Sequence, residues 1–172
     1  MKKLFLAFVF FLTTYTVIAQ DLYTASREND IALIEQLITK GADVNQANDR
    51  GFTPLILAVY NDNKEAVLSL LKNGANPNAQ DKSGNNALMG AAFKGYQEMV
   101  DVLLAHQADV NQVNFNGATS LIFAVTFGRN DIAKKLIEKG ADLNIKDFNG
   151  KTAKDHALLQ ENKEMIELLT TM

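Results

Sequence analysis

The sequence of 172 residues contains no cysteine. This absence excludes a disulfide framework, a thiolate metal site, a cysteine nucleophile and a lipidated N-terminal cysteine. It does not exclude an oxidising compartment, because a chain of this length can bury a core large enough to fold without disulfides.

Groups suited to catalysis are also scarce. The chain has only two histidines, His106 and His156. His156 follows Asp155, an order that would suit an orienting pair in catalysis, but we expect both to be polar residues on an exposed C-terminal helix. A Walker-type phosphate loop and the G-x-G and H-E-x-x-H patterns are absent. The sequence therefore predicts no enzyme, no cofactor and no metal site.

The chain has no strong excess of one charge, with 17 basic and 20 acidic residues. This balance disfavours a nucleic-acid partner, because affinity for nucleic acid comes largely from neutralising phosphates. After the N-terminus, no segment is apolar over the roughly 20 residues that a bilayer span needs. We therefore expect no membrane insertion of the main part of the chain.

The first 19 residues differ from the rest and predict a cleavable secretory signal peptide. Lys2 and Lys3 precede an apolar run over 4–12, and Val17 and Ala19 stand at the −3 and −1 positions before Gln20. This layout is typical of signal peptidase substrates. An uncleaved membrane anchor is the alternative, but the apolar run is short for a span. Either interpretation places the remaining residues, 20–172, outside the cytoplasm, in the periplasm or secreted.

Three residue types recur in these remaining residues at a step of 33. Glycine occupies 51, 84, 117 and 150, alanine occupies 25, 58, 91, 124 and 157, and leucine occupies 37, 70, 103, 136 and 169. A fixed period of this length is typical of a chain that stacks one small structural unit. We expect the alanines to let helices of neighbouring units approach closely, and the leucines to fill their shared core.

The segment 81–113 shows what one unit contains. Gly84 supplies a backbone that can take positive φ in a tight turn. Asn86 can cap a helix over 87–93. A second helix is predicted over 97–105, where apolar residues recur at helical spacing.

These features resemble the ankyrin repeat, whose pattern has a tip of the form D-x-x-G-x-T-P-L, two antiparallel helices and the sequence G-A-D-V-N. It is found here as Gly51-Phe52-Thr53-Pro54-Leu55 and Gly41-Ala42-Asp43-Val44-Asn45. The resemblance implies an all-α solenoid of about five helix-turn-helix units with β-turn or hairpin tips. The units would span about 20–47, 48–80, 81–113, 114–146 and 147–172.

Two loop positions bear on stability and metal binding. Gln107 replaces the glycine found at 41, 74 and 140, so a left-handed backbone there would be strained. Asp43, Asp109 and Asp142 occur one per repeat, without the clustered carboxylates that calcium needs. We expect these aspartates to bond to the local backbone.

In the ankyrin family, tips and first helices line a concave groove where proteins bind, and the resemblance implies the same surface here. Aromatic residues occupy these positions, although solvated tips usually favour polar residues, and basic residues flank them. An alternative is that some rings fold back onto the neighbouring repeat as core. The predicted binding residues are Arg50, Phe52, Tyr60, Lys82, Phe93, Lys94, Phe115, Phe127, Phe148 and Lys151.

The sequence thus favours a non-catalytic protein–protein interaction module of the cell envelope, monomeric on its own. It would protect or assist an envelope or stress-defence protein. The alternatives are a periplasmic immunity protein that neutralises a toxin enzyme and, less favoured, an accessory subunit of an enzyme.

Overall fold

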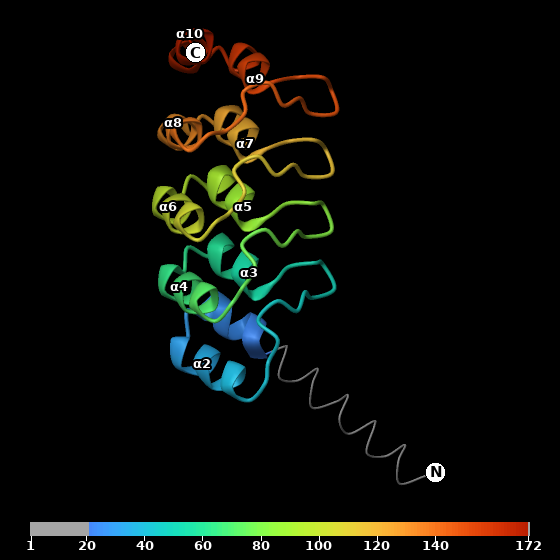
Figure 1. Ribbon diagram of the computed structural model, residues 1–172, viewed down its shortest axis with the longest axis vertical. Coiled ribbons are helices and arrows are strands. Elements are labelled where there is room, and N and C mark those ends of the chain that lie inside the picture. The colour runs from blue at the N-terminus through green and yellow to red at the C-terminus, as the bar shows by residue number, and fades with distance from the viewer. Residues whose placement is uncertain (1–20, 172) are drawn as a thin grey trace, which may run out of the picture. The chain divides into compact units, whose positions relative to one another are not determined.

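The computed structural model describes residues 21–171, in which every regular element is a helix. The predicted signal peptide lies outside the described residues. Residues 21–28 form the first described helix. The labelled helices are α2 (Ile31–Thr39), α3 (Pro54–Tyr60), α4 (Lys64–Lys72), α5 (Ala87–Lys94), α6 (Gln97–Ala105), α7 (Ser120–Thr126), α8 (Asn130–Glu138), α9 (Ala153–Leu159) and α10 (Lys163–Thr171) (Figure 1). The predicted all-α class is confirmed.

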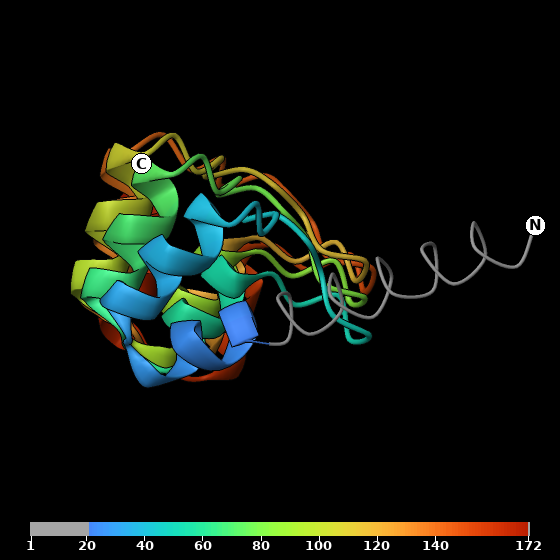
Figure 2. The same ribbon diagram turned by 90° about the horizontal axis from the view of Figure 1, so that it is seen from below.

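The chain divides into two compact units, with the boundary between Asn76 and Pro77. In the first unit, α4 packs against both α2 and α3. In the second unit, α5, α7 and α9 lie in one row, and α6, α8 and α10 lie in another (Figure 1). In both units the turn-rich tips extend away from the helices (Figure 2).

The alanines and leucines that recur every 33 positions lie in the core of both units. All five alanines of the series, at 25, 58, 91, 124 and 157, are 0% exposed. The five leucines of the series are also buried. A larger side chain at an alanine position would force neighbouring helices apart, because protein cores are close-packed. Both series are therefore buried, as their expected roles in the packing of the repeats require.

Polar caps explain where the first helices of the last four repeats, α3, α5, α7 and α9, begin. The side chains of Thr53, Asn86, Thr119 and Thr152 each accept a hydrogen bond from the backbone N–H three residues later. Such a bond satisfies one of the N–H groups that have no partner inside the helix. Pro54 stands at the first position of α3, where a missing N–H carries no penalty.

Candidate partner-binding surface

Each tip is organised by one asparagine or aspartate side chain. At positions 48, 81, 114 and 147, the Oδ1 atom accepts two backbone N–H groups, from two and four residues later, at 2.8–3.1 Å. These bonds fix the turn that presents the neighbouring side chains. The sequence interpretation contained these positions only as the first residue of the D-x-x-G tip pattern and missed their bonding role.

In the second unit, neighbouring tips are joined through their backbones. Phe115 N–H donates to Ser83 O at 3.1 Å, and Phe148 N–H donates to Asn116 O at 2.9 Å. The ring of Phe115 lies over Gly84, so closely that a Cβ on this glycine would be 2.7 Å from Cδ1 of the ring. Gly84 is therefore required both for its φ of 78° and for this close approach.

Phe115 and Phe148 are nevertheless solvent-exposed, at 60% and 78%. No ring contact joins them among the aromatic pairs formed by residues 21–171. Their exposure excludes a core role for either ring. The tips therefore hold two aromatic side chains where solvent alone would favour polar ones.

Phe93 and Phe127, at the ends of the first helices of two neighbouring repeats, pack against each other. Their ring centroids are 4.6 Å apart in an edge-to-face arrangement, and Phe123 stacks on Phe127 at 6.3 Å. Both Phe93 and Phe127 still contact solvent. They form a partly exposed aromatic cluster. The rings pack against one another, as the core alternative expects, and they also keep solvent-exposed surface, as the binding alternative expects.

An open apolar pocket of about 160 Å³ lies beside this cluster in the second unit. We call it the α7 pocket. Its lining residues are Ala118, Ile122, Phe123, Thr126, Phe127, Asp147 and His156.

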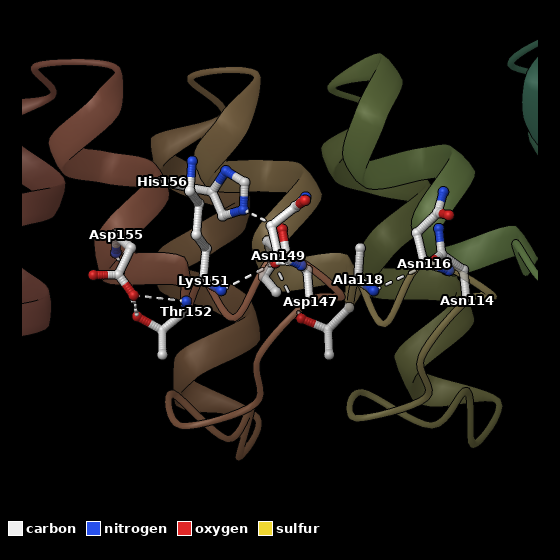
Figure 3. A network of polar contacts seen from close by, with 11 residues as sticks. Asn114, Asn116, Ala118, Asp147, Asn149, Lys151, Thr152, Asp155 and His156 are labelled. Atoms are coloured by element: carbon white, nitrogen blue, oxygen red, sulfur yellow. Dashed lines mark hydrogen bonds and ion pairs between the residues drawn. The ribbon is translucent and has the colours of Figure 1, made fainter.

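The structure corrects the expectation for His156. Its Nε2 atom lies 2.9 Å from Oδ2 of Asp147, and the two side chains are only 16% and 8% exposed (Figure 3). His156 is therefore not an exposed polar residue of the last repeat. Asp155 is no partner of the ring, because its carboxylate accepts from Thr152 in the capping box of α9 (Figure 3). The pairing joins a tip to the following helix, which sequence adjacency could not reveal.

Hydrogen bonds from neighbouring groups stabilise the ionised form of Asp147. Burial alone would raise its pKa, but N–H groups of Lys151 and Asn149 and the ring of His156 bond to the carboxylate. Together these bonds lower the pKa of Asp147 below its ordinary value. Both oxygens of the carboxylate are therefore already hydrogen-bonded within the protein.

In the first unit, Phe52 and Tyr60 form a tilted ring pair with centroids 6.0 Å apart. Phe52 and Arg50 also line an open pocket of about 470 Å³. Tyr23 and Arg27, which the sequence interpretation missed, lie in the same wall. Burial, followed by the carboxylates of Asp43 and Asp49, raises the pKa of Tyr23. The complete lining is Tyr23, Arg27, Asn48, Asp49, Arg50, Phe52 and Leu57.

Family comparisons match this repeated architecture. A family model described as "Ankyrin repeats (3 copies)" matches residues 22–114, more than half of the chain. The chain belongs to the ankyrin repeat family. A second model, "Ankyrin repeats (many copies)", matches residues 103–157. A search of curated proteins finds no match to the chain.

Basic residues stand near the aromatic positions of the ankyrin tips. In the second unit, Lys82 and Lys94 are exposed and Lys151 is half-buried. None of the three forms an ion pair within the part of the chain that the structure describes. Lys134 and Lys135, by contrast, form ion pairs with Glu164 and Asp101, and both lie on the second-row helix α8. Positive charge beside the second unit's aromatic positions is therefore not neutralised internally.

The ankyrin loop aspartates have local structural roles. Asp43, Asp109 and Asp142 each accept a hydrogen bond at 2.9 Å from the backbone N–H two residues later, which confirms the expectation for them. Within residues 21–171, no three acidic or histidine side chains gather closely enough to hold a metal ion. No helix in that range has the length and apolar character needed to cross a bilayer.

Proposed function

We propose that this ankyrin repeat chain is a non-catalytic protein-binding module of the cell envelope. The observation that carries the proposal is the exposure of Phe115 and Phe148 on adjacent tips. Aromatic side chains dominate the binding energy of protein interfaces, since they bury a large area with few rotatable bonds. The neighbouring Phe93–Phe127 cluster would extend the same kind of contact.

The flanking charge indicates the chemistry of the partner surface. Lys82, Lys94 and Lys151 have no internal ion-pair partner among the described residues, while the whole chain has a net charge of −3. Basic groups around an aromatic centre favour an acidic or mixed surface, mainly through faster association and specificity. The partner is therefore proposed to be a protein with acidic groups around an apolar contact.

The envelope location rests on the basic start, the apolar run and the small residue at Ala19. Within the envelope, we favour a protein that protects or assists an envelope or stress-defence protein. A tight one-to-one complex with a toxin enzyme would instead identify an immunity protein.

The test is affinity capture from a periplasmic extract with residues 20–172 as bait. The double variant Phe115→Ala/Phe148→Ala should lose the captured partner while keeping its thermal midpoint, because neither ring is part of the core. The matched control is Leu158→Ala/Leu159→Ala, which removes two side chains that are 51% and 59% exposed on α9. Equal capture by both double variants and the unchanged chain would overturn the proposed surface.

A further inference from the structure

The α7 pocket has the size of one apolar side chain. Its volume is about 160 Å³. An apolar cavity of about 150 Å³ in another protein is known to accommodate benzene. The α7 pocket is therefore much smaller than the roughly 300–1,000 Å³ typical of sites for drug-sized ligands. A single leucine, isoleucine or phenylalanine side chain matches this space better than a whole cofactor does.

The repeat period explains why the pocket exists. Ala118 and Thr126 stand two periods after Phe52 and Tyr60, whose rings contact each other at 6.0 Å in the first unit. The earlier repeat thus fills these two positions with rings, and the later repeat leaves them small. The α7 pocket is the space that results, next to the exposed ring of Phe127.

The walls of the pocket favour a neutral occupant. Asp147 is the only carboxylate in the lining, and its two oxygens already bond two backbone N–H groups and His156. The hydroxyl of Thr126 is buried, so it offers no accessible charge or polar group to a ligand. A charged side chain entering the pocket would lose its hydration, and it would find the two titratable side chains of the lining, Asp147 and His156, already paired with each other.

We propose that the α7 pocket receives one neutral apolar side chain, of leucine to phenylalanine size, from the protein partner. The inference rests on the proposed function and adds the chemistry of one anchor residue. Phe127 in the pocket wall, together with Phe93 packed against it, would cover the neighbouring part of the partner chain. Such an anchor, fully desolvated in a preformed pocket, is the arrangement found at interface hot spots.

The pocket can be tested without the partner. The methyl resonances of Ala118 and Ile122 in residues 20–172 would be followed by NMR during titration with N-acetyl-leucine amide and N-acetyl-phenylalanine amide. We expect saturable shifts with a Kd on the order of 1 mM, as suits so small a ligand. N-acetyl-aspartate amide should give no saturable shift. Absence of saturation with both apolar probes, or equal binding of the acidic probe, would overturn the inference.

A filled pocket provides the specific control. Ala118→Phe introduces the residue that the chain itself has at position 52, and should weaken binding of both apolar probes at least tenfold, as read from Ile122. Asn85→Phe adds the same ring at the equivalent position of the preceding repeat, and should leave probe binding unchanged. The thermal midpoints of Ala118→Phe and Asn85→Phe are both measured, because Asn85→Phe also removes the oxygen that accepts a hydrogen bond from Asn114 Nδ2.

Partner capture separates the two proposals. If Ala118→Phe binds probes as the unchanged chain does, the pocket inference fails whatever the partner does. If the unchanged chain captures a partner through Phe115 and Phe148 but Ala118→Phe captures it equally well, the pocket inference alone is overturned. If the apolar probes bind saturably while the Phe115→Ala/Phe148→Ala variant captures the partner as well as the unchanged chain does, the proposed surface fails and the pocket inference stands.

Discussion

Gln107 occupies a position where the other repeats have glycine. Its φ is 64°, in the left-handed region, and the equivalent Gly41, Gly74 and Gly140 have φ of 91°, 86° and 88°. Non-glycine residues are strained there because Cβ crowds the backbone carbonyl. The sequence alone predicted this strain. Glycine at three of the four equivalent positions indicates that the backbone there is left-handed, and Gln107 is the residue that departs from the series.

Gln107→Gly should therefore raise the free energy of unfolding by about 1 kcal/mol. For a domain of this size, the thermal midpoint should rise by roughly 2–4 °C. The matched control is Gly140→Gln, where a Cβ would meet no atom within 4 Å, so only backbone strain is added. That change should lower the midpoint. A lowered midpoint for Gln107→Gly would show that Gln107 does not strain the backbone at this position.

Asp147 should make stability depend on acid pH. Its pKa is lower in the folded chain than its ordinary value, so its stabilising effect is complete above about pH 4 and is lost as pH falls through the folded pKa. Asp147→Asn should cost about 1 kcal/mol at pH 7, because the charge-assisted bond to His156 is lost. Asn114 shows that asparagine can form the two backbone bonds of a tip.

This prediction is tested by thermal unfolding at pH 7 and pH 3. The difference between Asp147→Asn and the unchanged chain should be smaller at pH 3 than at pH 7, because pH 3 lies below the ordinary pKa of an aspartate, where the stabilisation by the ionised form begins to be lost. Asp142→Asn removes one charge from an exposed loop and serves as the control. A difference that is equal at both pH values would show that the ionised form of Asp147 has no special stabilising role.

At the scale of the element, helix α7 has a threonine at each end with opposite consequences. The hydroxyl of Thr119 caps the helix by accepting from the N–H of Ile122 at 3.2 Å. The hydroxyl of Thr126 is buried and has no hydrogen-bond partner within the described part of the chain. One side chain satisfies a free backbone group, while the other leaves its own polar atom unsatisfied.

The same substitution should therefore have opposite signs at the two ends of α7. Thr119→Val should lower the free energy of unfolding by about 1 kcal/mol, the usual value of a lost cap. Thr126→Val should raise it by about 1 kcal/mol, because a methyl group replaces an unsatisfied buried hydroxyl. Urea unfolding measures both values. Destabilisation by Thr126→Val would mean that its hydroxyl finds a partner in solution.

Helices were more predictable than the spaces between them. The helix predicted over 97–105 is α6 (Gln97–Ala105), and the one predicted over 87–93 ends one residue later, at Lys94. Caps and apolar spacing are local signals, and both lie within a few residues. The α7 pocket instead depends on two small residues eight positions apart and on a tip from the next repeat, so no local pattern indicates it.

At the scale of the whole molecule, the 33-residue period predicted the family and left the partner open. The alanines and leucines of the period are buried in the scaffold, so these residues say nothing about binding. The residues that vary at equivalent positions, such as Phe52, Asn85, Ala118 and Lys151, distinguish one repeat's surface from the next. Exposure then separates rings that face solvent from rings that pack, which the sequence alone could not do.

Export is the last property of the whole chain that can be tested directly. Expressed with residues 1–19, the protein should be recovered from the periplasm with Gln20 as its first residue, by intact mass. Loss of Lys2 and Lys3 with no acidic residue would change the net charge from −3 to −5.

Signal peptidase needs a small residue at −1 but tolerates variation at −2. Ala19→Gln should therefore block cleavage, whereas Ile18→Gln should not. A wild-type product that retains residues 1–19 at the membrane would favour the uncleaved anchor.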